Sequence, residues 1–286
     1  MKLKKFLSEL IVLFFYSIVQ LIYTLPIIGK RTLWKSIPAS VKSYNFSYPN
    51  KFFIKKMRGL VVNERSFMRM SNLYKKEPQT FNFLNELNEN DILWDIGANI
   101  GQIALPLSKK NNIKIICFEP EPSNFFILSN NVYLNNLSHK IFLANIALHD
   151  QDGFINLPFN ESNIGFIDAG RSMLSVSNPK SSNELGKNFL TLPGMTGNTF
   201  LKINSDLIPN AIKLDVDGNE LNVLNGMNDI LLRTELKRIV IETVFDGQAK
   251  NSTDIIETLT KYNFIRSKEF EDPESKSMKN LFFIRD

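Results

Sequence analysis

The sequence predicts an α/β fold built on a Rossmann-like sheet with helices on both faces. Short apolar runs with the length of buried strands alternate with stretches of helical periodicity, and several of these runs end in an acidic residue. The clearest unit is residues 92–105, where an apolar run ends at Asp95, glycines follow at Gly97 and Gly101, and a helical pattern begins. A strand, a glycine turn and a helix form the first unit of a nucleotide-binding α/β fold.

The turn after this strand is expected to contact a cofactor. Glycines let the backbone approach a ligand without a Cβ atom, a helix start presents free N–H groups, and Asp95 lies at the strand end where open α/β sheets bind ligands. Dehydrogenases place glycines at the first, third and sixth positions of the turn. Here Asn99 lies between Gly97 and Gly101, and an acid precedes them. This pattern suits a ligand with hydroxyls and a positive charge, such as S-adenosylmethionine, and an ordinary turn with a solvated aspartate is the alternative.

The other elements are expected in order along the chain. A helical pattern over residues 77–87 precedes the first strand. Further strands are expected at residues 113–118, 141–144, 211–214, 239–241, 264–265 and 281–284, and further helices at 124–134, 220–225 and 253–262.

Residues 151–210 interrupt this alternation and are rich in Asn, Ser, Gly and Pro. The segment is long for a simple connection. We expect hairpin strands near residues 153–157 and 189–192. Residues 165–177 fit a substrate lid, and an ordinary surface loop fits them equally well.

Glu119 follows the second strand, roughly 20 residues after Asp95, where nucleotide-binding folds hold a ribose. A carboxylate can accept hydrogen bonds from both ribose hydroxyls. A solvated glutamate in a loop is the alternative.

Several ordered motifs together resemble the FkbM family of S-adenosylmethionine-dependent methyltransferases. The matching segments are residues 95–101, Phe118-Glu119-Pro120 with Asn130, Asn131 and Asn135, residues 147–150, residues 212–220 and residues 239–242. The sequence departs from the family at two places: Asp217 stands where the family usually has glutamate, and no Leu-Asp pair is evident near Phe200 and Leu201.

The resemblance implies a class I methyltransferase fold, with the final strand antiparallel and inserted into the sheet, and S-adenosylmethionine as the cofactor. The residues and the resemblance together give the expected cofactor-binding set: Asp95, Gly97, Asn99, Gly101, Glu119, Pro120 and Ala147.

Acids at the strand ends are the candidates for catalysis. A sugar hydroxyl is weakly nucleophilic near neutral pH, so a base assists methyl transfer to it. Asp215, Glu242 and Glu220 are the expected catalytic residues, and His149 is the next candidate because its ordinary pKa suits proton transfer. Capping of a helix start is the alternative role for residues 215–220. Carboxylate oxygens also suit a divalent cation, but their spacing predicts no metal site.

Composition excludes several classes of protein. With one cysteine, Cys117, the chain can form no internal disulfide or cysteine metal cluster, and two histidines are too few for a multi-histidine site. The net charge is +5, but Lys and Arg are spread along the chain, so no nucleic-acid partner is predicted.

Residues 1–35 differ from the rest of the chain. An apolar run at residues 6–28 follows Lys2, Lys4 and Lys5 and precedes further basic residues, which predicts a membrane-associating helix. It fits a spanning helix, an interfacial helix or a signal peptide. The expected organisation is this segment, a lead-in at residues 36–73 and a methyltransferase domain at 74–286, on the cytoplasmic side of the membrane.

The sequence therefore predicts a methyltransferase that uses S-adenosylmethionine and acts on a sugar hydroxyl of a glycan or glycolipid. A dinucleotide-dependent oxidoreductase and a non-catalytic membrane-tethered binding module are the alternatives. The oligomeric state is not indicated.

Overall fold

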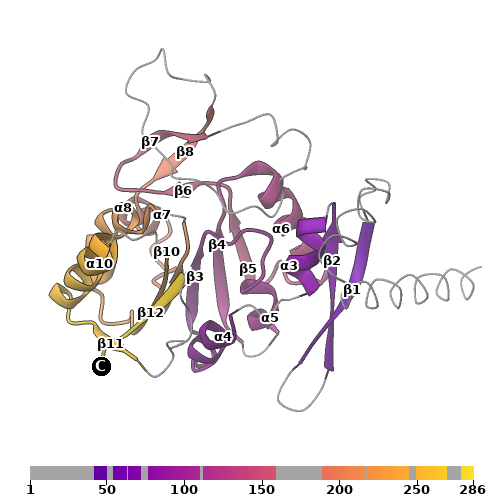
Figure 1. Cartoon of the computed structure of the whole chain (residues 1–286), viewed down its shortest axis with the longest axis horizontal. Helices are drawn as coiled ribbons and strands as arrows, with labels where there is room; N and C mark the ends of the chain where they lie inside the picture. The colour runs from indigo at the N-terminus through magenta and orange to yellow at the C-terminus, as the bar shows by residue number, and fades with distance from the viewer. Residues whose placement is uncertain are drawn as a thin grey trace, which may run out of the picture. The chain divides into compact units, whose positions relative to one another are not determined.

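The protein has the predicted Rossmann-like α/β fold (Figure 1). The computed structural model describes residues 42–49, 54–62, 64–71, 77–109, 112–158, 189–216, 218–244, 249–268 and 278–286. Within these ranges the main sheet has seven strands in the order β11-β12-β10-β9-β3-β4-β5. They are β3 (Ile92–Ile96), β4 (Lys114–Phe118), β5 (Ile141–Ala144), β9 (Ala211–Leu214), β10 (Arg238–Val244), β11 (Ile265–Ser267) and β12 (Met278–Ile284).

The sheet is mixed, as the resemblance implied. Strands β5, β4, β3, β9 and β10 are parallel neighbours. Strand β12 lies between β10 and β11 and is antiparallel to both. The central strands are apolar because helices cover both faces of the sheet.

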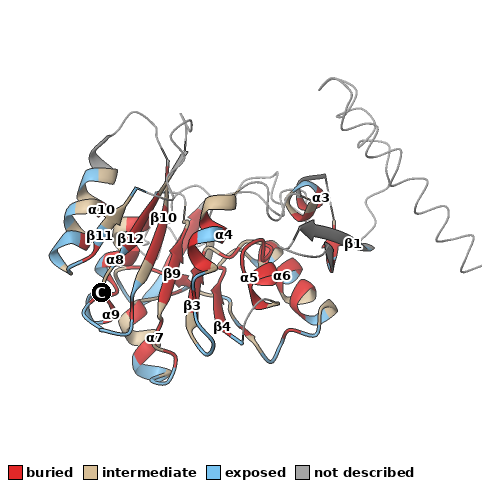
Figure 2. Ribbon diagram, turned by 90° about the horizontal axis from the view of Figure 1, so that it is seen from below, coloured by how far each residue is buried: buried red, intermediate tan, exposed pale blue. Residues whose placement is uncertain are grey.

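Helices cover the two faces in two groups (Figures 1 and 2). One group is α4 (Pro78–Leu84), α5 (Ala104–Ser108) and α6 (Pro122–Leu134), and the other is α7 (Gly197–Ile203), α8 (Glu220–Asn225), α9 (Asn228–Leu231) and α10 (Ala249–Lys261). Trp94 and Ile96 of β3 pack with the second group. Since side chains alternate along a strand, Asp95 faces the first group. On that side Phe83 of α4 meets Phe282 of β12, with ring centroids 5.1 Å apart.

A smaller sheet covers part of the carboxyl edge. It contains β6 (Ala147–Leu148), β7 (Gly153–Pro158) and β8 (Phe189–Met195), and β7 pairs antiparallel with β8, which confirms the expected hairpin. Helix α7, which the sequence did not predict, begins after Thr196, whose side chain accepts a hydrogen bond from Thr199 N at 3.0 Å. The lid expected at residues 165–177 lies outside the described residues.

Part of the predicted lead-in packs on the methyltransferase domain. Strands β1 (Lys42–Pro49) and β2 (Ile54–Val61) form a hairpin, and α3 (Glu64–Ser71) follows it. Asn131 of α6 accepts a hydrogen bond from Leu60 N at 2.6 Å and donates one to Ile100 O at 2.9 Å. One buried amide thus joins β2 to the glycine turn.

The predicted membrane segment, residues 1–35 with the apolar run 6–28, lies outside the described residues. Within the ranges that the structure covers, no helix combines the length and the apolar character needed to cross a membrane.

Candidate cofactor and acceptor site

A cleft of about 660 Å³, including the part open to solvent, lies at the carboxyl ends of β3, β4 and β9. Six residues expected in the site line it: Gly97, Asn99, Glu119, Pro120, Ala147 and Asp215. His149, the next catalytic candidate, also lines it, together with three polar residues that were not expected: Arg69, Asn124 and Asn219. Apolar side chains complete the wall, among them Phe118, Leu148 and Leu157.

The glycine turn has the unusual backbone that its sequence indicates. Its glycines are required by close packing within the protein, and not only by the approach of a ligand. Gly97 has φ +79°, and a Cβ atom there would lie 1.8 Å from the carbonyl oxygen of Asp215. Glycine is therefore required because β9 approaches the turn. Gly101 does not line the cleft; a Cβ atom there would meet Leu128 of α6 at 2.9 Å. This second glycine allows α6 to pack closely.

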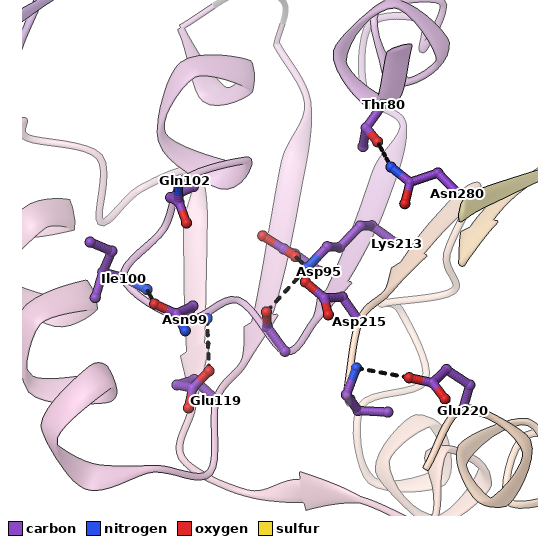
Figure 3. A network of polar contacts seen from close by, with 12 residues as sticks. Thr80, Asp95, Asn99, Ile100, Gln102, Glu119, Lys213, Asp215, Glu220 and Asn280 are labelled. Carbon is purple, nitrogen blue, oxygen red and sulfur yellow. Dashed lines mark hydrogen bonds and ion pairs between the residues drawn. The ribbon is translucent and has the colours of Figure 1, made fainter. Parts of the chain in front are cut away.

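Glu119 links the glycine turn to the start of α6, and Figure 3 shows its hydrogen bond with Asn99. Its carboxylate accepts hydrogen bonds from Asn99 N at 2.7 Å and Glu121 N at 3.0 Å, and Asn124 Nδ2 lies 3.4 Å away. Burial raises the pKa of Glu119 from 4.5 to about 7, against the lowering effect of these donors. Oε2 accepts one of these bonds and Oε1 accepts the other two, so Oε2 keeps acceptor capacity for a ligand hydroxyl.

Asp95 does not line the cleft, contrary to the expected cofactor contact. It is fully buried within β3, beside Lys213 of β9, and its Oδ1 lies 3.5 Å from Lys213 Nζ (Figure 3). Burial raises the pKa of Asp95. We assign Asp95 to this internal pair and not to the cofactor.

Lys213 connects three parts of the carboxyl edge of the sheet: the turn at Gly97, Asp215 after β9, and Asp95 of β3. Its Nζ donates hydrogen bonds to Gly97 O at 3.1 Å and to Asp215 Oδ2 at 3.2 Å. Burial alone would lower the pKa of Lys213, but the carboxylates of Asp215 and Asp95 raise it, so the ammonium stays charged. Asp215 therefore lies in the cleft as a carboxylate held by a buried cation.

The other two expected catalytic acids do not line the cleft. Glu220 Oε1 accepts hydrogen bonds from Gly218 N at 3.0 Å and Val216 N at 3.4 Å, which closes the loop between β9 and α8. Burial raises the pKa of this carboxyl. Glu242 is a half-buried residue of β10, where it pairs in register with Asn280 of β12. The structure thus brings only Asp215 of the three into the cleft.

Arg69 reaches the cleft from the lead-in, where no motif indicated it. Its Nη1 donates to Gln102 Oε1 at 2.7 Å, and Gln102 Nε2 donates to Arg69 O at 3.2 Å. These bonds fix the end of α3 beside the glycine turn. No sequence signal identified Arg69, because it belongs to a segment before the recognised motifs.

Residues 95–266 match the family described as the Methyltransferase FkbM domain. The chain belongs to this family. As an FkbM methyltransferase it uses S-adenosylmethionine as its cofactor, and the predicted family and cofactor are confirmed. The residues in the cleft fit this cofactor: Glu119 offers an acceptor for a ribose hydroxyl, and the apolar wall suits a purine.

The FkbM chain is similar to a curated protein, hexuronic acid methyltransferase AglP of Haloferax volcanii. The two are 28% identical over 197 residues, which cover 66% of this chain and 75% of the relative.

Solved structures with a similar arrangement include two methyltransferases. Precorrin-6y C5,15-methyltransferase of Geobacter metallireducens has a TM-score of 0.43 and 13% identity, covering 77% of this chain and 89% of that one. The tRNA methyltransferase TrmK of B. subtilis has a TM-score of 0.42 and 13% identity, covering 74% of this chain and 67% of that one. Similarity at this level carries no information on the acceptor.

One departure from the family pattern has a structural role in this FkbM chain. Phe200 of α7 packs edge-on against Phe118 and Trp94, with centroid distances of 4.8 and 5.3 Å. The residue therefore belongs to the core beneath the cleft. The other departure, Asp217, lies outside the described residues.

Proposed function

We propose that this methyltransferase transfers the methyl group of S-adenosylmethionine to a hydroxyl oxygen of a sugar in a glycan or glycolipid. The observation that carries the proposal is the cleft itself, which Asp215 and Arg69 line together with the residues that fit the cofactor. A polar acceptor with its own negative charge suits such a cleft. The name of the relative, a hexuronic acid methyltransferase, supports a hexuronic acid as the first acceptor to test.

The residues of the chain have separate parts in this proposal. Glu119 and the turn at Gly97 and Asn99 hold the cofactor, which supplies an activated methyl group. Asp215 contacts the acceptor and takes its proton, and Arg69 attracts an acidic sugar. Glu220 and Glu242, expected as further catalytic residues, have no part in it because neither lines the cleft.

The test uses S-adenosylmethionine with a labelled methyl group. The acceptors are the methyl glycosides of glucuronic acid, galacturonic acid and glucose. We expect label in at least one uronide and less in the glucoside. Mild alkali then identifies the oxygen, since a methyl ether survives and a methyl ester of the sugar carboxylate is hydrolysed. If alkali releases the label, the methyl acceptor is the sugar carboxylate and not a hydroxyl. If neither the sugars nor a lipid-linked glycan extract is labelled, the proposed acceptor class is rejected.

The acceptor and the N-terminal segment together suggest a place of action. We propose that residues 6–28 attach the enzyme to the membrane, with the methyltransferase domain on the cytoplasmic side. The support is the apolar run flanked by lysines, a pattern of membrane-surface segments.

A further inference from the structure

His149 is fixed at the base of the cleft by contacts on both sides of its backbone. Its N–H donates to Met195 O of β8 at 2.9 Å. Its carbonyl oxygen packs on Gly226 so closely that a Cβ atom there would lie 2.0 Å away. The residue is 3% exposed and lines the cleft. The imidazole thus has a defined position and does not belong to a surface loop.

The two ring nitrogens of His149 have different surroundings. Nδ1 lies 2.6 Å from Oδ1 of Asp150, although the two groups are not aligned as a hydrogen bond. A carboxylate oxygen offers only lone pairs, so at this distance it favours hydrogen on Nδ1. In a neutral imidazole the other nitrogen, Nε2, is then an acceptor. Nε2 is buried, and the described part of the chain offers it no hydrogen-bond partner.

A buried acceptor without a partner calls for a ligand donor. Ile146 and Leu148, which precede His149 in the sequence, also line the cleft, as does Leu157, and all three are apolar. Such a wall suits a flat purine and is a poor surface for a sugar, whose hydroxyls it could not pair. Adenine offers one donor group on its ring, the exocyclic amino group, which matches the free acceptor.

We propose that Nε2 of His149 accepts a hydrogen bond from the exocyclic amino group of the cofactor's adenine, and that Asp150 is the positioning residue that fixes the tautomer. His149 then selects adenine against a 6-oxo purine, whose oxygen would face the lone pair of Nε2. A site built to pair a polar group rejects the analogue that lacks it. The inference rests on the cofactor and not on the identity of the methyl acceptor.

Calorimetry with two stable ligands tests this selection. The probes are S-adenosylhomocysteine and S-inosylhomocysteine, and the proteins are the parent, His149→Leu and His139→Leu. His139, the other histidine of the chain, is exposed and does not line the cleft, so it is the matched control. We expect the parent and His139→Leu to prefer the adenosyl ligand, and His149→Leu to lose about tenfold of that preference. An unchanged preference in His149→Leu overturns the proposal. So does unchanged binding of both ligands with reduced turnover, which would make His149 a base.

Nuclear magnetic resonance provides a second test that does not require His149 to be replaced. In His139→Asn, labelled with ¹⁵N-histidine, the two remaining ring signals belong to His149. We expect hydrogen on Nδ1 and none on Nε2, and a shift of the Nε2 signal when S-adenosylhomocysteine is added. Hydrogen on Nε2, or an Nε2 signal that does not respond to the ligand, contradicts the proposal.

Discussion

The ammonium group of Lys213 donates a hydrogen bond to the carbonyl oxygen of Gly97 at 3.1 Å, which ties β9 to the glycine turn after β3. The same group contacts Asp215, which lines the cleft, and Asp95, which is buried beneath it. One buried cation thus determines both the shape of the cofactor turn and the position of the acid proposed to meet the acceptor.

Lys213→Met should destabilise the fold strongly, because it leaves the buried carboxylate of Asp95 without its cation. Breaking a buried ion pair on one side costs about 3–5 kcal/mol. Urea unfolding measures the loss. Adding Asp95→Asn to Lys213→Met should recover part of it, since the uncompensated charge is then gone. Additive losses in the double variant would contradict a direct coupling between the two residues.

Gly97→Ala should cost more stability than the strain of a positive φ alone. The left-handed backbone costs about 1–2 kcal/mol for a residue with a side chain. At Gly97 the new Cβ atom also meets the carbonyl of Asp215. Gly153→Ala is the control, because Gly153 has φ +137° and no atom within 4 Å of the added Cβ. We expect a larger fall in melting temperature in Gly97→Ala than in Gly153→Ala, and lost cofactor binding in Gly97→Ala only. Equal effects of the two changes would show that the clash is unimportant.

The strands were predictable from the sequence because central parallel strands are apolar on both faces, as in β3 and β4. The face of β3 on which Asp95 lies could not be predicted from the sequence. An acid at a strand end is typical of a ligand contact. Its buried partner, Lys213, could not be identified because it is distant in the sequence. For Glu220 the sequence left a helix-capping role open, but its hydrogen bonds from Val216 N and Gly218 N hold the loop before α8 and not the first turn of the helix. Arg69 carried no signal because the lead-in lacks a motif.

Asp215→Asn tests the proposed contact with the acceptor. The amide keeps the size of the side chain and removes its charge. We expect the affinity for S-adenosylmethionine to stay within a few-fold and turnover to fall by roughly 10²–10⁴-fold. Glu242→Gln, outside the cleft, should keep near-parent turnover. Near-normal transfer by Asp215→Asn removes that residue from the mechanism, and a selective loss of turnover in Glu242→Gln would return Glu242 to it.

Removal of residues 1–35 should release the enzyme from membranes and leave the cofactor site intact. The apolar run at 6–28 precedes every residue that lines the cleft. Sedimentation with membranes in high salt, together with cofactor calorimetry on the truncated chain, measures both effects. A truncated chain that still sediments would locate the membrane contact in another segment.

The binding of S-adenosylmethionine through Glu119 is the central claim, and calorimetry across pH tests it directly. The carboxylate form is the one that accepts a hydrogen bond from the ribose, so affinity should rise as pH passes about 7, where the Glu119 pKa lies. Without ligand, folding stability should change in the opposite direction. Between pH 4.5 and 7 the unfolded chain has lost the Glu119 proton and the folded chain retains it, so stability falls by up to about 3 kcal/mol across that window.

Glu119→Gln should weaken binding by about 1.5–3 kcal/mol and remove both pH effects at this site. Tight binding of S-adenosylmethionine and none of NAD is the predicted result; equal binding by Glu119→Gln, or preferential binding of NAD, would contradict the account.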